Sequence, residues 1–353
     1  MRTVGLVLEP LDTLFFRSGR PFGAGLPGES GLPNPQNFAG ALRSYLLKRA
    51  GADFEAMRGK PSPAEAFEAA GARWLAGVRF RGPWLAEIRN PQSPKPFVPV
   101  PADLTMHAGK PTLLRPLAAD LPGWQPPETG MKPLWFRGGR PDKEAPGLLS
   151  WDGLGAYLQG DGIMAGQLRP AVELYQLEER TGITVDERTQ SAAEGLIYST
   201  RALRLERGVA FYGEVDLPEE QAQWFDREQA MSWGGERHHV IVRRVPPVGW
   251  PPDPGGPRVK LLLLAPGFFS PVPWRPAAIA AGTLRAAAVA GPFAVSGWDL
   301  ARRGPKPARF GAAAGSVYFL EGGQAPRGRQ LATGEDEMVG YGLFVKGVWK
   351  YAE

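Results

Sequence analysis

Proline and glycine are the residues that most limit how this chain can fold. Its 353 residues include 46 glycines and 37 prolines, about twice the usual share. Proline breaks the interior of a helix, and glycine weakens helices and favours turns. The sequence therefore predicts many turns, long ordered loops and few long helices, and it excludes a helical bundle or a coiled coil.

The rest of the composition narrows the chemistry. Apolar residues make up 43% and charged residues 22% of the chain, which is ordinary for a globular protein. The length predicts two domains, or one domain with long insertions. The absence of cysteine excludes disulfides, thiolate zinc sites, iron–sulfur clusters and a cysteine nucleophile. The three histidines are His107, His238 and His239. We therefore expect no metal and no other cofactor.

The charge balance favours an anionic partner. The chain carries 41 basic and 36 acidic residues, and 31 of the basic residues are arginine. Arginine binds phosphate with its planar fork and stacks on bases, so this excess suits a nucleic-acid binder. A GC-rich genome or a hot habitat would give the same excess. Because no apolar run reaches the length of a membrane span, we expect a cytoplasmic protein without membrane contact.

The apolar periodicity of residues 1–245 predicts one domain. It gives a strand at 4–8, a helix at 38–46 capped by Asn37, a hairpin at 203–215, a helix at 217–230 and a strand at 239–242. Residues 51–170 are dense in proline, glycine, tryptophan and arginine, and we interpret them as a large insertion. Without the insertion, the order of strands and helices is that of a ferredoxin-like fold.

A proline-rich segment at 246–258 predicts a linker between two domains. Residues 259–353 then form the second domain, with an alanine-rich helix predicted at 277–290 and no second helix. The predicted strands lie at 260–264, 293–298, 316–320 and 343–349. The predicted fold class is thus α+β, with two tandem ferredoxin-like (RRM-like) domains, the second degenerate, and long glycine- and proline-rich loops.

Three polar stretches are candidates for phosphate contacts. The first loop carries Arg17 and Arg20 ahead of a helix N-terminus, which favours an anion. The segment 180–198 has the composition of a projecting hairpin that touches nucleic acid. The segment 302–310 places four cations and an aromatic residue in a loop held extended by prolines. In each stretch the alternative is a loop whose charges are solvated or paired with acids.

Other motifs leave different chemistries open. A histidine beside Arg237 could support metal-independent RNA cleavage, although the sequence shows no second acid. Residues 23–28 match a dinucleotide-binding fingerprint, but the helix begins too late for that site. The acids at 335–337 could hold Mg²⁺ or simply face water. Residues 340–345 partly match the strand that stacks bases in RNA-recognition modules.

In this order along the chain, the motifs resemble one family. It is the third subunit of the Cmr-type, type III-B CRISPR effector complex, in the RAMP superfamily. The resemblance rests on LD at 11–12, FFR at 15–17, GRPF at 19–22, GALR at 40–43, TGI at 181–183, EGLIY at 194–198, GGE at 234–236, GWD at 297–299, KP at 306–307 and GYG at 340–342.

The resemblance implies a non-catalytic RNA-binding scaffold. Such a subunit holds the repeat-derived 5′ handle of the CRISPR guide RNA, contacts the large palm-domain subunit and a backbone RAMP subunit, and meets target RNA indirectly. The alternatives are a metal-independent RAMP-type endoribonuclease that processes repeat RNA and a nucleotide-dependent enzyme. In RAMP endonucleases the histidine typically lies near the first helix, where this chain has none. The expected RNA-binding residues are Arg17, Arg20, Asn37, Arg43, Arg180, Thr181, Arg188, Thr189, Arg302, Arg303, Lys306, Arg309 and Tyr341.

Overall fold

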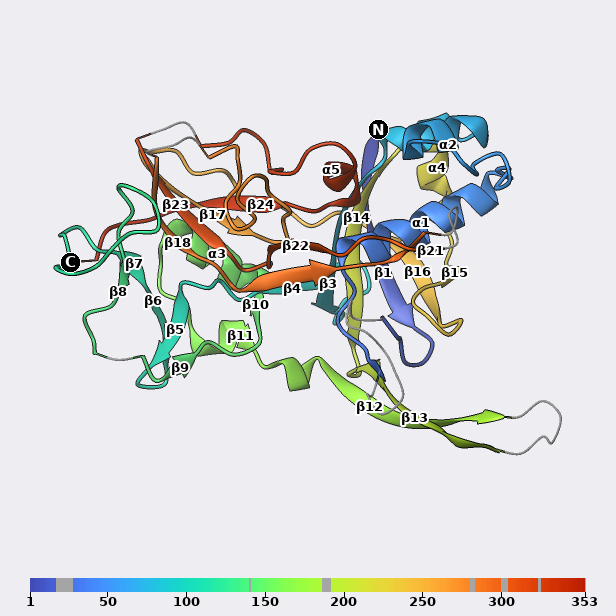
Figure 1. Ribbon diagram of the computed structural model, residues 1–353, viewed down its shortest axis with the longest axis horizontal. Helices are drawn as coiled ribbons and strands as arrows, with labels where there is room; N and C mark the ends of the chain where they lie inside the picture. Colours follow the sequence, from blue (N-terminus) through green and yellow to red (C-terminus); the bar gives the residue numbers. More distant parts are fainter. Residues whose placement is uncertain are drawn as a thin grey trace.

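The computed structural model has an α+β architecture built on several sheets that are mostly antiparallel (Figure 1). It describes residues 1–16, 28–139, 141–185, 192–279, 283–299, 304–322 and 325–352. No helix in these ranges is both long enough and apolar enough to cross a bilayer. The α-helices are α1 (Pro35–Arg49), α2 (Pro63–Ala69), α3 (Trp151–Gln159), α4 (Glu219–Ala222) and α5 (Glu335–Val339), and the 3₁₀ turns are η1 (Arg73–Gly77), η2 (Ala165–Gln167), η3 (Ala171–Glu173) and η4 (Gln223–Phe225).

The largest sheet has eight strands, and all of its strand pairs are antiparallel. The strand β1 (Arg2–Pro10) is flanked by β14 (Val209–Leu217) and β16 (His239–Val245), which are distant from it in the sequence. The spatial order is β11 (Leu168–Arg169), β10 (Leu148–Ser150), β4 (Lys95–Pro99), β3 (Arg79–Glu87), β14 (Val209–Leu217), β1 (Arg2–Pro10), β16 (His239–Val245) and β15 (Gln229–Ser232).

A second, four-stranded antiparallel sheet is formed by the C-terminal part of the chain. Its order is β18 (Leu284–Ala288), β23 (Val317–Glu321), β17 (Arg258–Leu263) and β24 (Phe344–Val348). The central strands of the first sheet are ordered β3-β14-β1-β16. When each set of four is numbered along the chain, both sheets have the order 2-3-1-4. The two halves of the molecule therefore share one topology.

A long hairpin projects from this body (Figure 1). It consists of β12 (Tyr175–Val185) and β13 (Ala192–Leu205), and β13 also pairs in parallel with β2 (Gly28–Glu29). The expected projecting hairpin at 180–198 is thus confirmed for its described strands. The remaining short pairs are β5 (Leu104–His107) with β6 (Lys110–Leu113) and β9 (Lys143–Glu144), β7 (Arg115–Pro116) with β8 (Leu134–Trp135), β19 (Pro292–Val295) with β22 (Arg309–Ala312), and β20 (Trp298–Asp299) with β21 (Gly304–Pro305).

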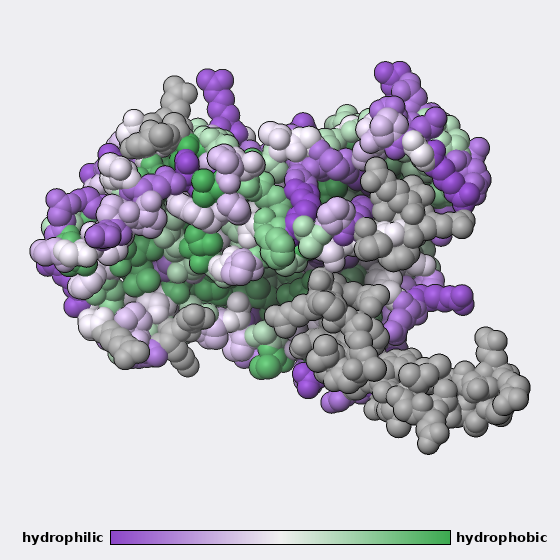
Figure 2. Space-filling view, viewed as in Figure 1, coloured by the Kyte–Doolittle hydropathy of each residue, from purple (hydrophilic) through white to green (hydrophobic). Residues whose placement is uncertain are grey.

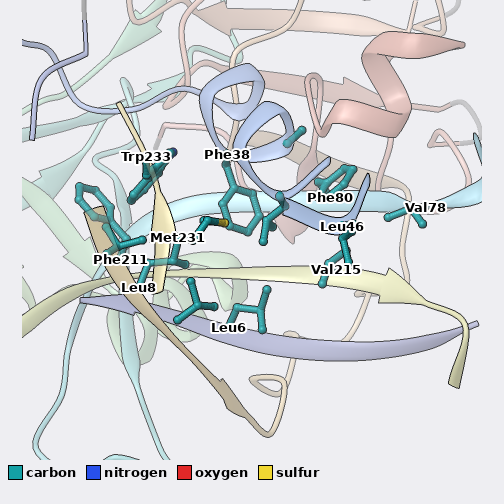
Figure 3. Close-up of a cluster of buried hydrophobic side chains, with 14 of the residues drawn as sticks. Leu6, Leu8, Phe38, Leu46, Val78, Phe80, Phe211, Val215, Met231 and Trp233 are labelled. Carbon is teal, nitrogen blue, oxygen red and sulfur yellow. The ribbon is translucent and has the colours of Figure 1, made fainter. Parts of the chain in front are cut away.

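The core follows the two-residue period of the strands. In β1, Leu6 and Leu8 face a cluster that also contains Phe38 and Leu46 of α1, whereas Val7 faces the opposite cluster. Figure 3 shows the α1 side of this packing. The opposite cluster is shared by the eight-stranded sheet, α3 and one face of the four-stranded sheet. Both faces of the central strands are therefore buried, with successive side chains entering opposite clusters.

Several predicted elements differ from the structure. The predicted helix at 277–290 is wrong, because 284–288 is strand β18, paired with β23. The predicted helix at 217–230 is reduced to α4 and η4, and β15 begins at Gln229. The predicted hairpin at 203–215 is also wrong, since β13 and β14 belong to different sheets. The C-terminal half does have a helix between its last two strands, the short α5.

The region at 51–170 and the proline-rich segment are both integrated into the body. Residues 51–170 supply β3, β4, β10 and β11 to the eight-stranded sheet, which the interpretation as an insertion did not anticipate. In the segment 246–258, the Trp250 indole donates to Glu214 Oε2 over 3.0 Å, and the Val248 N–H donates to the Tyr212 hydroxyl over 2.9 Å. This segment is therefore anchored along the first sheet.

Candidate functional site

Four segments that are distant in the sequence meet in one small cleft, which we call the α1–α5 cleft. It has a volume of about 220 Å³. Hydrophilic side chains gather around the position of α5 between the two halves of the molecule (Figure 2). The cleft contains four of the expected RNA-binding residues, Arg43, Lys306, Arg309 and Tyr341. Its full lining is Gln36, Ala39, Gly40, Arg43, Val295, Ser296, Gly297, Lys306, Pro307, Arg309, Glu335, Asp336, Val339 and Tyr341.

Helix α1 forms one wall because its N-terminus is strongly specified. Pro35 is at the first position of the helix, where its missing N–H costs nothing. The Asn37 N–H donates to Asn34 Oδ1 over 3.1 Å, and the Asn34 N–H donates to Asn37 Oδ1 over 2.9 Å. The predicted N-cap is therefore corrected: Asn34 is the cap, and Asn37 completes a reciprocal capping box. Its side chain is engaged there.

Arg43 lies on α1 in a closed environment. Its side chain is 13% exposed and forms an ion pair with Glu335 of α5. Its guanidinium lies 5.4 Å from the ring centroids of both Phe67 and Phe80. An arginine held by two rings and a carboxylate links α1 to α5. In this arrangement it offers little surface to an RNA phosphate.

Arg309 is held from both sides but stays open. It donates to both carboxylate oxygens of Asp336, over 2.7 and 2.5 Å, and its guanidinium lies 4.0 Å from the Phe268 ring centroid. Its side chain is still 46% exposed. The hydrogen bonds with Asp336 raise the pKa of Arg309 above its ordinary value. Arg309 is thus always charged, but its charge is neutralised inside the molecule.

Lys306 is an exposed cation of the cleft. Its N–H donates to the Gly297 carbonyl over 2.7 Å. A Cβ added at Gly297 would lie 2.4 Å from Gln36 Nε2 and 3.8 Å from Lys306 Cδ, so both side chains pack against that glycine. No carboxylate in the described ranges forms an ion pair with Lys306. Its charge is therefore available to an anion.

Tyr341 is buried beneath the cleft, with 2% of its surface exposed. Its ring packs against Phe268 at a centroid distance of 4.9 Å, and its hydroxyl donates to Asn34 Oδ1 over 3.4 Å. Burial raises the pKa of Tyr341. A ring buried to this extent has no free face for base stacking, so Tyr341 lines the cleft from below. Its contact with RNA stays a prediction.

The acids at 335–337 are paired with arginines and do not face water alone. They form the first turn of α5, and each carboxylate pairs with a different arginine: Glu335 with Arg43, Asp336 with Arg309, and Glu337 with Arg79 over 3.1 Å. Within the described ranges, no group of three or more acidic or histidine side chains converges in a way that could hold a metal ion. The expectation that they are merely solvated is also wrong.

The base of the projecting hairpin carries a second charged group. Arg180 donates to Glu178 Oε1 over 3.0 Å and to Asp12 Oδ2 over 3.2 Å. The hydrogen bond from Arg180 is the main cause that lowers the pKa of Glu178. Thr181 lies on β12, where its backbone is opposite Ser199. The Arg180 side chain is 42% exposed, so it pairs with two carboxylates and is still accessible to solvent.

The family model of the CRISPR-associated protein Cas_Cmr3 matches residues 6–349. This chain belongs to the Cas_Cmr3 family. The resemblance noted in the sequence is thereby confirmed, and residues 51–170, where the sequence motifs were weakest, lie within the match. No curated protein sequence matches the chain.

Solved structures share the fold of this Cmr3-family chain. A chain in the cryo-EM structure of the type III-B Cmr-beta bound to cognate target RNA aligns with a TM-score of 0.54 at 14% identity, covering 89% of this chain and 86% of that chain. The same assembly with cognate target RNA and AMPPnP gives a TM-score of 0.50 at 15% identity, with the same coverage. At these identities the likeness concerns the fold.

The two adjacent histidines of this Cmr3-family chain have different neighbours. His239 is exposed on β16, and its Nε2 lies 3.1 Å from Ser232 Oγ on the neighbouring strand β15. The pKa of the Asp12 carboxyl group is lowered, mainly by a hydrogen bond from the Thr13 backbone. The charge of the nearby His238 contributes to the same effect. Ser232 is a weak partner for general acid–base chemistry.

Six of the expected RNA-binding residues lie outside the described residues: Arg17, Arg20, Arg188, Thr189, Arg302 and Arg303. The glycine fingerprint at 23–28 also lies outside them, except for the backbone of Gly28. The structure brings together Arg43, Lys306, Arg309 and Tyr341, and it places Arg180 and Thr181 in the separate hairpin.

Two contributions to the cleft were missed in the sequence. Gln36 lines the cleft from the first turn of α1, and the Pro-Asn-Pro motif at 33–35 was the signal that could have placed it. Asp336 was considered only as a metal ligand or a solvated acid. Its pairing with Arg309 crosses from α5 to β22, which no local sequence pattern reports.

Proposed function

We propose that this chain is a non-catalytic RNA-binding scaffold subunit of a type III-B CRISPR effector complex. It holds the repeat-derived 5′ handle of the guide RNA and links the large palm-domain subunit to the backbone RAMP subunits. The observation that carries this proposal is membership of the Cas_Cmr3 family over residues 6–349. The likeness to a chain of an RNA-bound type III-B assembly supports it.

The architecture supports the proposal. We interpret residues 1–245 and 259–353 as two ferredoxin-like domains joined by 246–258. The common strand order 2-3-1-4 is the order of that fold, and α1, α4 and α5 follow β1, β14 and β23 where its helices belong. Sheets of this kind with projecting loops are a common platform for single-stranded RNA.

The charges of the molecule favour single-stranded RNA over catalysis. The α1–α5 cleft offers Lys306 beside the start of α1, and the hairpin β12–β13 extends a second, separate element away from the body (Figure 1). Phosphate contacts of this kind fix the register of an RNA without any hydrolytic group. We therefore place handle binding at the cleft and a spacing role at the hairpin.

The first test is a tagged pull-down of the full-length chain from native cytoplasm, with sequencing of the RNA 5′ ends and identification of the proteins. We expect RNAs that share one repeat-derived 5′ end, together with a palm-domain subunit and a repeated backbone subunit. Recovery of the chain free of RNA would contradict the proposal. Cleavage of repeat RNA in a chelator, abolished by His238→Ala or His239→Ala, would instead establish the endoribonuclease alternative.

The second test locates the RNA. Lys306→Ala removes one phosphate contact, so handle affinity should fall about fivefold and the salt dependence should become shallower by about 0.7 in log–log slope. Lys110→Ala is the matched control, since Lys110 is an exposed lysine on β6, away from the cleft. If both variants bind like the parent chain, the cleft is not the handle site.

A further inference from the structure

The first turn of α5 places two carboxylates in the α1–α5 cleft, where an RNA backbone would need cations. Glu335 and Asp336 both line the cleft, and their partners Arg43 and Arg309 line it too. Two of the three cations of this site are therefore neutralised within the protein, and Lys306 is the third. An RNA-binding cleft whose arginines already have carboxylate partners needs a physical explanation.

The Arg309 pair has the geometry that arginine uses for phosphate. Both terminal nitrogens of Arg309 donate to the two oxygens of Asp336, over 2.7 and 2.5 Å. This parallel fork is the form in which guanidinium recognises carboxylate and phosphate alike. Asp336 thus occupies the hydrogen-bonding positions that a non-bridging phosphate oxygen pair would take.

The two arginines differ in how far their partners can be exchanged. The Arg43 side chain is 13% exposed between two aromatic rings, whereas the Arg309 side chain is 46% exposed. The Arg309 guanidinium also lies 4.0 Å from the Phe268 ring centroid, a contact in which Asp336 takes no part. An incoming anion can therefore replace Asp336 on Arg309 without rebuilding the cleft, but it cannot reach Arg43 in the same way.

We propose that Asp336 is an internal phosphate mimic, which holds Arg309 in its RNA-binding geometry and must be displaced by a phosphate of the guide RNA. This inference rests on the proposed function, because it assigns regulation to the same cleft. The contact is autoinhibitory: it weakens binding of short or nonspecific RNA, and only an RNA held elsewhere on the molecule displaces the carboxylate. Glu335 and Arg43 remain a permanent support between α5 and α1.

The test removes one negative charge at a time from the first turn of α5. Asp336→Asn removes the charge that competes for Arg309 and keeps the size of the side chain. In the full-length chain assembled with its partner subunits, labelled single-stranded RNA with the repeat-derived 5′ end should bind about five- to tenfold more tightly. The log–log salt slope should steepen by about 0.7, because one more phosphate is neutralised.

Glu337→Gln is the matched control. Glu337 belongs to the same turn, but its partner Arg79 is not part of the cleft lining, so RNA affinity should not change. Adding Arg309→Ala to Asp336→Asn should abolish the gain. Asp336→Ser is a second neutral variant, and thermal unfolding of each variant shows that the chain is folded.

The outcomes separate this inference from the proposed function. If the parent assembly binds the RNA with salt-dependent affinity while Asp336→Asn and Asp336→Ser bind equally or more weakly, Asp336 is only a structural clamp and the inference is overturned. If neither the parent nor any variant binds the RNA in a salt-dependent way, the proposed function itself is overturned.

Discussion

Two groups of charged side chains in this protein have similar composition and opposite surroundings. Lys260, Tyr157 and Asp103 form a closed group in which each residue is at most 2% exposed. Arg309 and Asp336 form an open pair at the α1–α5 cleft, with side chains 46% and 22% exposed. The Phe268 ring lies beside Arg309, so each group has a cation, a carboxylate and an aromatic ring, and the difference between them is burial.

The closed group joins two parts of the chain. The Lys260 ammonium of β17 lies 3.3 Å from the centroid of the Tyr157 ring on α3, and the Tyr157 hydroxyl donates to Asp103 Oδ1 over 2.8 Å. Away from water a charge depends on its partners, because desolvation is expensive. At the cleft, water and salt can replace a partner at little cost. Burial thus makes the first group structural and leaves the second exchangeable.

The largest expected effect is the loss of Asp103. Asp103→Ala leaves the Tyr157 hydroxyl without its acceptor and Lys260 without its counter-charge, so the free energy of unfolding should fall by about 3 kcal/mol. Urea denaturation measures this. Asp120→Ala is the control, because Asp120 pairs with Lys132 at the surface, and it should leave stability unchanged. Equal effects of the two substitutions would remove the distinction between closed and open groups.

The pH dependence of stability tests the same group through Lys260. Burial lowers the pKa of Lys260 from 10.5 to about 8. Between pH 8 and 10 the unfolded chain therefore binds more protons at this site than the folded chain, so stability rises with pH, by up to about 2 kcal/mol. Denaturation of the parent chain and of Lys260→Met at both pH values measures the difference in slope. Identical slopes would mean that Lys260 is solvated.

A glycine substitution tests the position of α5 in the open region. Gly340 has φ +104°, and a Cβ there would lie 2.5 Å from the Phe80 carbonyl oxygen of β3. Gly340→Ala should therefore cost about 2 kcal/mol. Gly328→Ala measures the cost of the positive φ alone, since Gly328 has φ +70° and an added Cβ would meet no neighbouring atom. We expect it to lower the free energy of unfolding by about 1 kcal/mol. If the two costs are equal, the approach of α5 to β3 is not tight.

The smallest expected effects compare the two cleft pairs directly. Double-mutant cycles should give a coupling of about 1 kcal/mol for Arg43 with Glu335 and about 0.3 kcal/mol for Arg309 with Asp336, because Arg309 is more exposed than Arg43. Raising the salt concentration should remove most of the second coupling and little of the first. The reverse order would show that Arg43, and not Arg309, has the exchangeable partner.

The sequence predicted the regular elements whose pattern is local. The apolar spacing of Phe38, Leu42 and Leu46 gave α1, which spans Pro35–Arg49, and the alternation in 4–8 gave β1. The strands at 260–264, 316–320 and 343–349 correspond to β17, β23 and β24. Helix α1 has apolar residues at helical spacing, whereas β17 and β23 are short apolar runs buried on both faces. Both are local patterns that can be found without knowing the contacts between distant segments.

The sequence failed where local preference and tertiary contact disagree. Alanine favours helices, and the residues at 284–288 are mostly alanine, yet they form β18 because they pair with β23 and bury Leu284, Ala286 and Ala288. Alanine does not mark a period of two, so this burial left no signal in the sequence. The hairpin predicted at 203–215 failed because β14 pairs instead with β3, which lies more than a hundred residues earlier.

The sequence by itself determined the family of this protein, the absence of cysteine chemistry, the main strands and the helix α1, because motifs and periodicity are written locally. Only the tertiary structure decided which charges are neutralised. Arg43 and Glu335 are separated by 292 positions, and Lys260 meets Tyr157 and Asp103 across the two halves of the chain. The strength of such a pair depends on the distance and the solvent exposure of its members, and the fold sets both.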